Sequence, residues 1–319
     1  MLDNLCDVPG VLVGHATDYE GLTGCTAILF DRPAVVAVDV RGSSPGTRET
    51  DRLGPLGIVR DTHAILLTGG SAFGLAAADG VVRFLEEKDV GLDIGVAKIP
   101  LVSAAVIFDL MFGSPDARPD ADMGYKAAAA ARSEDFEQGS VGAGTGATVG
   151  KILGLENAMK GGVGSASARL DGGLIVAALA VVNAVGDVRD EQGNILAGPR
   201  REDGGLADSV DLMPQAADRM RWGQNTTLGV VATNARLTKP EATKVAQMAH
   251  DGLARAIYPV HTSVDGDVVF VAGVGETETA PDVVGAWGAQ MMQKSILRAV
   301  RAAKGIPGIP SLAEYAGEG

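Results

Sequence analysis

Continuous apolar runs bounded by turn residues recur along the chain. Because each run is apolar at successive positions and not at alternate ones, the runs indicate strands that are buried on both faces. The predicted strands cover residues 11–13, 26–30, 34–40, 63–68, 174–183, 228–233 and 268–272. Helical stretches are predicted between them, over residues 72–88, 123–132, 239–257 and 283–303.

The helix predicted over residues 239–257 has the clearest start signal. Thr238 takes the N-cap position and Glu241 follows three residues later, which is the pattern of a capping box. Strands covered by helices, without regular alternation of one strand and one helix, favour an α+β or sandwiched arrangement of layers. The polar, glycine-rich residues 189–211 predict a surface loop at which the chain could tolerate a new pair of ends.

The composition predicts a large core and argues against several classes of partner. The chain has 319 residues, of which 46% are hydrophobic and 21% charged, enough for one big domain or two. With 44 glycines and 4% aromatics, closely packed Ala and Val are expected to fill the core. The net charge of -13 argues against nucleic acid and anionic membranes, because both are bound mainly through Lys and Arg.

The N-terminal residues MLDNLCDVPG lack the basic and apolar sections of a secretory signal. No uncharged apolar stretch reaches the ~20 residues of a membrane span. We therefore expect a cytoplasmic protein without a membrane partner. In a reducing compartment structural disulfides are rare, so Cys6 and Cys25 are expected to be buried thiols.

The glycine-rich stretch over residues 139–151, GSVGAGTGATVGK, fails as a nucleotide-binding motif. For a phosphate-binding loop, the first glycine would fall on Thr145, and Lys151 is followed by Ile152 in place of Ser or Thr. Gly142 and Gly144 fit the loose dinucleotide pattern, but no predicted strand precedes them and no acidic residue follows about 20 positions later. No nucleotide cofactor is expected.

The remaining polar residues give no metal site and no familiar triad. The four histidines, His15, His63, His250 and His261, lack HxH and HExxH spacing, and with two distant cysteines they predict no metal. The chain has no GxSxG elbow, so Ser71 in LTGGSAFG is interpreted as a helix cap. We predict neither a metal nor an organic cofactor.

Two short polar segments stay open on local grounds. Asn225 and Thr226 precede the predicted strand LGVVAT, where they could be an ordinary polar strand start or the end of a cleavable segment. Asp265, Gly266 and Asp267 fit a solvated hairpin turn. If that turn folds inward, its two carboxylates could instead hold an amine and tune its protonation.

Long blocks of sequence carry a resemblance that covers roughly residues 5–275. They include DVPGVLVGHATDYEGLTGCTAILF, VDVRGSSPGTRETD, HAILLTGGSAFGLAAADGVVRFLEE, GSVGAGTGATVGK, MKGGVGSAS and NTTLGVVATNARLTKPEATKVAQMAHDGLARAIYPVHTSVDGD. In these blocks the chain resembles the L-aminopeptidase/D-esterase (DmpA-like) family of N-terminal-nucleophile hydrolases. β-Aminopeptidases and nylon-oligomer (aminohexanoate) endo-hydrolases belong to that family.

The resemblance implies a single α+β domain over residues 1–319, folded as a four-layer αββα sandwich. It implies autocleavage between Asn225 and Thr226, which would give subunits 1–225 and 226–319 assembled as a homotetramer. Asn225 ahead of the nucleophile matches the nylon-oligomer branch.

Further site residues are carried over by position. Lys151 and Asn183 match the family's lysine and asparagine beside the nucleophile, and Asp265 and Asp267 match its acidic pair. Phe108 stands at a substrate-binding position where several members have a tyrosine, so the hydrogen bond of that hydroxyl is lost or supplied otherwise.

The implied chemistry is hydrolysis of amide or ester bonds of short peptides, amino-acid amides or related amino-bearing substrates through an acyl-enzyme. The freed α-amine of Thr226, with a reference pKa of ~7.7–8.0, would be the base for its own hydroxyl. Asn183 and a backbone N–H would hold the oxyanion, Lys151 or one of the aspartates would assist self-cleavage, and the aspartates would seat the substrate's ammonium group.

Three alternatives remain open. The first is an endo-hydrolase of aminohexanoate oligomers, favoured by Asn-Thr-Thr and disfavoured by Phe108. The second is an acyltransferase similar to ornithine acetyltransferase, which would pass the acyl group to an amine. The third is an uncleaved, non-catalytic binding protein.

Overall fold

The structure, a computed structural model, describes residues 1–216 and 224–317. Its large sheet contains β1 (Val11–Asp18), β2 (Thr23–Val40), β3 (Thr47–Arg48), β4 (Asp61–Thr68), β7 (Val102–Val106), β10 (Gly162–Arg169), β11 (Ile175–Asn183), β14 (Thr226–Ala235) and β16 (Val268–Thr277). The short strands are β5 (Leu92–Asp93), β6 (Lys98–Ile99), β8 (Thr148–Val149), β9 (Met159–Lys160), β12 (Asp187–Arg189), β13 (Ile195–Ala197) and β15 (Ile257–Tyr258). The α-helices are α1 (Ala77–Glu87), α2 (Ala121–Ala130), α3 (Ser209–Ala216), α4 (Lys239–Ala256), α5 (Pro281–Ala302) and α6 (Leu312–Gly317).

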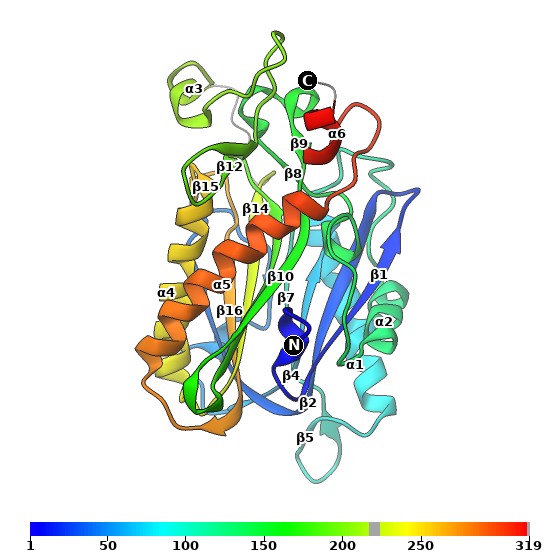
Figure 1. The fold of residues 1–319 in the computed structure, drawn as a ribbon. Helices are drawn as coiled ribbons and strands as arrows, with labels where there is room; N and C mark the ends of the chain where they lie inside the picture. The colour runs from blue at the N-terminus through cyan, green and yellow to red at the C-terminus, as the bar shows by residue number, and fades with distance from the viewer. Residues whose placement is uncertain (217–223, 318–319) are drawn as a thin grey trace.

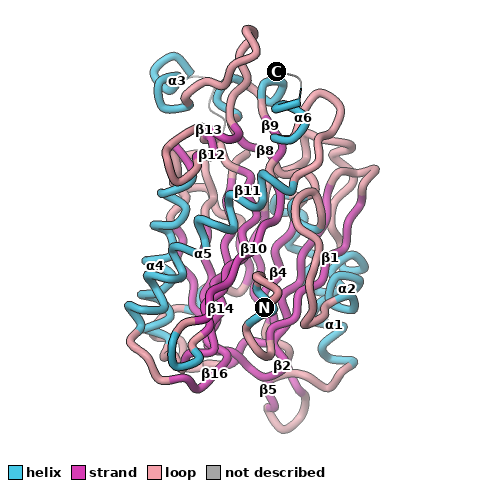
Figure 2. Tube along the Cα trace, viewed as in Figure 1, coloured by secondary structure: helices cyan, strands magenta, loops and turns pink. Residues whose placement is uncertain are grey.

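The large sheet has nine strands in the order β10-β11-β14-β16-β2-β4-β7-β3, with β1 also paired to β2. The long strand β2 joins its two halves. Residues 23–30 of β2 pair with β1, and residues 35–40 pair with β16 on the far half. Figures 1 and 2 show α4 and α5 covering one half of the sheet, while α1 and α2 lie beside the other.

Three apolar clusters fill the spaces between four layers. One lies between α4, α5 and the strands β11, β14 and β16. The second lies between the two halves of the sheet and includes Ile28 and Leu67 from one half and Leu179, Val230 and Phe270 from the other. The third packs α1 and α2 against β2, β4 and β7. Successive residues of the central strands alternate between two clusters, so the expected αββα sandwich is confirmed.

Most predicted elements are confirmed, with some corrections. The runs over 26–30 and 34–40 are one 18-residue strand, whose exposed residues 31–33 accompany a register shift against β4. The apolar runs predict no strand at β7 or β10. The helix predicted from residue 72 begins as a 3-10 helix over Ser71–Ala76 and becomes α1 only at Ala77.

Two local predictions have opposite outcomes. The capping box of Thr238 and Glu241 is present at the start of α4. The interpretation of Ser71 as a helix cap was wrong: the N-cap is Gly70, and no side chain caps that turn. A glycine suits the cap because its φ of 79° lies in the left-handed region.

The predicted surface loop over residues 189–211 is more ordered than expected. It contributes β13 to a three-stranded sheet in the order β13-β12-β15, while residues 190–194 and 201–205 lie mostly exposed between the paired segments. Within the described ranges, no helix has the length and apolarity needed to cross a membrane.

Candidate functional site

Thr226 is the first residue of β14, a strand with hydrogen-bonded neighbours on both sides. Asn183, the last residue of β11, lies directly opposite Thr226 in the antiparallel register. On the other side, Asn225 forms a parallel bridge with Asp265 just before β16. Thr226 and Asn225 are each only 4% exposed, so the bond between them is buried at one end of the central sheet.

The carbonyl of Asn225 has two hydrogen-bond donors. The backbone N–H of Gly266 donates to its oxygen at 2.8 Å, and the hydroxyl of Thr226 donates to the same oxygen at 2.5 Å. An N–H aimed at a carbonyl oxygen is the contact that stabilises an oxyanion once a nucleophile adds to the carbon. The hydroxyl that could attack is already in contact with the carbonyl group.

Lys151 donates hydrogen bonds to two residues beside the Asn225–Thr226 bond. Its Nζ donates to the backbone oxygen of Asn183 at 3.0 Å, to Oδ1 of Asn183 at 2.8 Å and to the backbone oxygen of Gln224 at 3.2 Å. These three oxygens accept and cannot donate, so together they take the three hydrogens of an ammonium group.

The side-chain amide of Asn183 is engaged at both ends. Its Oδ1 also accepts from the backbone N–H of Thr148 at 3.1 Å. Its Nδ2 donates to the backbone oxygen of Phe108 at 3.0 Å and reaches the oxygen of Gln224 at 3.5 Å. Phe108 thus meets Asn183 through its main chain, and its half-buried ring is not needed for that contact.

The Asp-Gly-Asp turn folds inward, and the expectation of a solvated hairpin turn is wrong. Asp265 is 2% exposed and Asp267 is 1% exposed. Asp267 accepts the backbone N–H of Thr227 at 2.6 Å and contacts His261 at 2.8 Å. Asp265 accepts from the hydroxyl of Thr262 at 2.5 Å and from its N–H at 3.0 Å.

Burial changes the proton affinity of the central groups. It raises the pKa of Asp265 to about 7, and the neighbouring charge of Asp267 adds to the rise. Burial lowers the pKa of Lys151 to about 7, against the attraction of Asp265 and Asp267, which favours its charged form. The three carbonyl oxygens around Nζ also favour the ammonium, so we assign Lys151 as a cation in this arrangement.

A second lysine, Lys160, lies further along the chain and is fully buried. Lys160 donates to the backbone oxygens of Thr145 at 2.8 Å and Ala147 at 2.7 Å. Burial lowers the pKa of Lys160 to about 7, and Asp109 opposes that shift. Asp109 accepts from Thr23 at 2.7 Å and belongs to the loop that follows Phe108.

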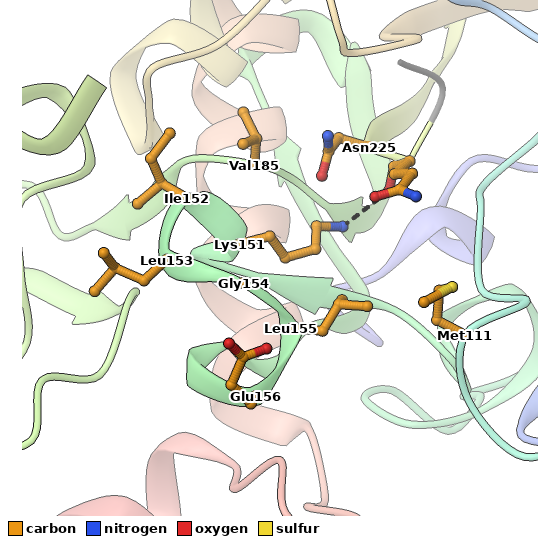
Figure 3. Close-up of a pocket in the computed structure, with 10 residues that line it drawn as sticks. Met111, Lys151, Ile152, Leu153, Gly154, Leu155, Glu156, Val185 and Asn225 are labelled. Carbon is orange, nitrogen blue, oxygen red and sulfur yellow. Dashed lines mark hydrogen bonds between the residues drawn. The ribbon is translucent and has the colours of Figure 1, made fainter. Parts of the chain in front are cut away.

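A cavity of about 540 Å³ opens beside the Gln224–Asn225 segment (Figure 3). Its walls combine apolar side chains with Lys151 and the exposed carboxylate of Glu156. The lining residues are Met111, Lys151, Ile152, Leu153, Gly154, Leu155, Glu156, Val185, Gln224 and Asn225. The cavity therefore lies beside Asn225, whose acyl group Thr226 would attack.

The structure therefore brings Thr226, Asn183, Lys151, Asp265 and Asp267 together. Sequence reasoning missed the N–H of Gly266, the carbonyl of Gln224 and the contacts of His261 with Asp267. The two backbone groups leave no residue-type pattern, and the only signal for His261 is its place six residues before Asp267. Cys6 and Cys25 are both free and buried, as expected. Across residues 1–216 and 224–317, no group of three or more His, Cys, Asp or Glu could hold a metal ion.

Comparison with known proteins agrees with this architecture. The model of peptidase family S58 matches residues 3–311. An uncharacterized aminopeptidase of Mycobacterium bovis is 40% identical over 97% of both chains. A 6-aminohexanoate-oligomer endohydrolase of Kocuria sp. is 34% identical, over 85% of this chain and 75% of its own.

Solved structures show the same fold at low identity. A β-aminopeptidase of Burkholderia sp. superposes with a TM-score of 0.73 at 22% identity, over 99% of this chain and 93% of its own. The L-aminopeptidase D-Ala-esterase/amidase of Ochrobactrum anthropi, described as a variant of the Ntn hydrolase fold, gives 0.74 at 17%, over 99% and 92%.

Fold and relatives together define a hydrolase of the amidohydrolase and aminopeptidase class with an Ntn hydrolase fold. The chain belongs to peptidase family S58.

Proposed function

We propose that the chain cuts its own bond between Asn225 and Thr226, giving subunits of residues 1–225 and 226–319. The freed Thr226 then hydrolyses amide or ester bonds of short peptides, amino-acid amides and related amino-bearing substrates. One observation carries the proposal: the Asn225 carbonyl accepts from both Gly266 N–H and the Thr226 hydroxyl at the end of a central strand.

Self-cleavage proceeds in two steps. The Thr226 hydroxyl oxygen adds to the carbonyl carbon of Asn225 while its proton passes to a base, and Gly266 N–H stabilises the oxyanion. The C–N bond then breaks as the leaving nitrogen takes a proton, which leaves an ester between Asn225 and the Thr226 side chain. Water hydrolyses that ester to a carboxylate on Asn225 and a free hydroxyl on Thr226.

We propose Asp265 as the base for the first step. Lys151 is the weaker candidate, because all three hydrogens of its ammonium are taken by carbonyl oxygens and no lone pair remains. Asp265, with its pKa raised to about 7 by burial, is poised near neutral pH. The rate of self-cleavage is expected to rise as pH increases through about 7, because the ionised form of Asp265 is the one that accepts the proton.

Turnover begins when Gln224 leaves its place. In the uncut chain, the Gln224 carbonyl accepts from Lys151 and lies within reach of the Asn183 amide. Cleavage makes Asn225 a free C-terminus, so Gln224 can move away and both donors become available to a substrate carbonyl. The new α-amine of Thr226 then accepts the proton of its own hydroxyl, and Asn183 and Gly266 hold the oxyanion of the acyl-transfer step.

The cavity beside Asn225 is proposed to receive the acyl half of the substrate. Asp265 and Asp267 already accept hydrogen bonds from the protein and are nearly inaccessible. They therefore act on a substrate ammonium only by long-range electrostatic attraction and not by direct contact. Glu156 is the exposed carboxylate of the wall and is proposed as the direct partner of that ammonium. Glu156→Gln should raise KM for free-amine substrates and leave KM for N-acetylated substrates unchanged.

Intact mass spectrometry of wild type and Thr226→Ala tests self-processing. Wild type should give two chains that end at Asn225 and begin at Thr226, and Thr226→Ala should stay whole. Thr226→Ser is the matched control, because it keeps the hydroxyl and should still cut. A wild-type chain that stays whole and hydrolyses nothing would support the non-catalytic binding protein instead.

An endo-hydrolase of aminohexanoate oligomers is the second candidate. The apolar cavity wall of Met111, Ile152, Leu153 and Leu155 fits a long aliphatic acyl chain, and a relative with that printed activity is 34% identical. Assays with linear aminohexanoate oligomers and with dipeptides of similar length separate the two activities. Adding an amine acceptor to the assay reveals acyl transfer, as expected of an ornithine-acetyltransferase-like enzyme.

We also propose a cytoplasmic homotetramer of cleaved pairs. The free, buried thiols of Cys6 and Cys25 suit a reducing compartment. Leu56 and Ile58 are each 95% exposed, and a subunit interface would cover such side chains. Light scattering on the purified protein measures the assembly, and a monomer at all concentrations would contradict it.

A further inference from the structure

Two histidines lie behind the acidic pair and take no part in the steps proposed above. His261 donates its backbone N–H to Oδ2 of Asp267 at 3.0 Å, and its Nδ1 lies 2.8 Å from the same oxygen. Its ring meets the ring of His250 edge to face, with centroids 4.7 Å apart. His250 is fully buried on α4, and its Nε2 lies 3.1 Å from the backbone oxygen of Asp39.

The partners of these rings determine where the hydrogens are. A carboxylate oxygen accepts, so Nδ1 of His261 must carry a hydrogen to bond Asp267. The backbone oxygen of Asp39 also accepts, so Nε2 of His250 carries the hydrogen there. Burial lowers the pKa of His250 to about 4 and keeps this ring neutral at ordinary pH. The other nitrogen of each ring has no hydrogen-bond partner among the residues that the structure describes.

The two carboxyls of the acidic pair have different donors. Asp267 accepts three N–H groups: the backbone of Thr227 at 2.6 Å, the backbone of His261 and its ring. Asp265 accepts one N–H and one hydroxyl, both from Thr262. N–H groups can only donate and therefore stabilise the anion, whereas a hydroxyl can also accept from a protonated carboxyl.

We propose that His261 decides which carboxyl of the acidic pair carries the proton. It fixes Asp267 as the lasting anion, which holds the N–H of Thr227 and thereby the start of β14. Asp265 is left as the group that gains and loses a proton beside the scissile bond. His261 is a positioning residue, since it acts on Thr226 only through Asp267.

The surrounding charges act on the two carboxyls unequally. Lys151 attracts both carboxyls and Asp265 more strongly than Asp267, so the N–H groups on Asp267 must outweigh that attraction. On the far side of the histidines, Arg41 donates to Asp39, which leaves that carboxylate paired within β2 and the loop after it. The charged and titratable groups around His261 and its neighbours are thus Lys151, Asp265, Asp267, His250, Asp39 and Arg41.

Carbon NMR of labelled aspartate in the uncut Thr226→Ala chain tests the placement of the proton directly. Asp265→Asn and Asp267→Asn assign the two carboxyl signals. At a pH below 7, Asp267 should give an ionised signal and Asp265 a protonated one. His261→Leu should bring the two signals together, and His261→Asn, whose amide N–H can replace Nδ1–H, should keep them apart. Signals that stay apart in His261→Leu would overturn the proposal.

The rate of self-cleavage gives the second readout, and this part rests on the proposed function. His261→Leu should slow cleavage roughly tenfold, as for loss of one charge-assisted hydrogen bond, and should change its pH profile. His261→Asn should restore most of the rate. Equal slowing in both variants with an unchanged pH profile would mean that the ring only packs, and would contradict the proposal. His15→Asn is the control, since this half-buried histidine contacts Thr26 on another part of the sheet.

The two readouts separate the possible failures. If wild type cleaves but its two carboxyl signals do not differ, the inference about His261 fails and the proposed function stands. If the signals differ as described but wild type never cleaves, the proposed function fails and the placement of the proton stands.

Discussion

Lys151 and Lys160 stand at the two ends of residues 151–160, and both have an unusually low pKa. Lys160 is fully buried and Lys151 is half-buried, and desolvation lowers the pKa of each to about 7. Their hydrogen-bond partners differ. Lys160 donates to two carbonyls of a single loop, whereas Lys151 joins the end of β11 to the carbonyl of Gln224. Only Lys151 lines the cavity.

The comparison shows that a lowered lysine pKa does not by itself mark a reacting group. Desolvation acts equally on a lysine that supports a loop and on one that holds a bond to be cut. What distinguishes Lys151 is a partner that the proposed reaction removes. The partners of Lys160, the carbonyls of Thr145 and Ala147, take no part in the proposed reaction, so we expect the effects of Lys160 to fall on stability.

The largest expected effect comes from Lys151→Met. Losing the cation that holds Asn183 and Gln224 should slow self-cleavage at least about a hundredfold, as for loss of an oxyanion-site donor. Gel electrophoresis of freshly purified chain against time measures this. Lys151→Arg keeps a cation that cannot act as a base, so it should cleave faster than Lys151→Met. Equal loss in both variants would instead indicate that neutral Lys151 takes the proton.

Lys160→Met should act on the fold. It leaves Asp109 without its buried cation and two carbonyls without a donor, which should lower the free energy of unfolding by about 3 kcal/mol. Urea unfolding of Thr226→Ala carrying the same change measures this without interference from cleavage. Under conditions where Lys160→Met is folded, its cleavage rate should stay within tenfold of wild type, and a hundredfold loss would erase the distinction between the two lysines.

The double change Lys160→Met with Asp109→Asn sharpens the same point. Asparagine removes the buried charge that Lys160 balances, so part of the lost stability should return, by about 1 kcal/mol. The comparison is the urea midpoint of the double variant against Lys160→Met alone. If the midpoint falls further, the charge of Asp109 is balanced elsewhere and the pairing is unimportant.

The pH dependence of stability is a smaller effect, and it follows from Lys160. The pKa of Lys160 is about 7 in the folded chain and 10.5 ordinarily, so between these values the unfolded chain binds more protons. The free energy of unfolding should therefore rise as pH increases above about 7. Replacing Lys160 by Met in the Thr226→Ala chain should flatten this rise. An unchanged slope would show that Lys160 is not desolvated in solution.

Phe108→Tyr is expected to have the smallest effect. Phe108 links the two regions, because its carbonyl contacts Asn183 and the next residue is Asp109. Since that contact uses the main chain, the added hydroxyl should change the rate of self-cleavage by less than about threefold. A larger change would mean that the ring position takes part in cleavage, and substrate assays on the mature enzyme would then need the same comparison.

The sequence predicted the strands that are rich in Val, Leu and Ile, because these runs are buried on both faces. It missed β10, whose Gly-Val-Gly-Ser-Ala-Ser sequence lacks bulky residues. The reason is packing: a Cβ at Gly164 would come within 2.1 Å of the backbone oxygen of Ser295 on α5. The long β2 was divided in two because Asp31, Arg32 and Pro33 resemble a turn.

The candidate site was predicted more completely than the local fold around it. Resemblance supplied Thr226, Lys151 and Asn183. In the structure, Asn183 lies opposite Thr226 and accepts hydrogen bonds from Lys151. The direction of the Asp265–Asp267 turn could not be predicted, because Asp-Gly-Asp suits a solvated hairpin as well as a buried turn. Its burial depends on long-range contacts with β14, which local sequence does not encode.

The place of β14 in the middle of the sheet has a consequence for the life of the molecule. After the bond before Thr226 is cut, β14 would still be hydrogen-bonded between β11 and β16. The two subunits should therefore stay associated. After denaturation, however, refolding of the two cleaved subunits is a bimolecular reaction, whereas folding of the uncut precursor is unimolecular. Recovery of the mature protein should therefore depend on concentration, and that of the precursor should not.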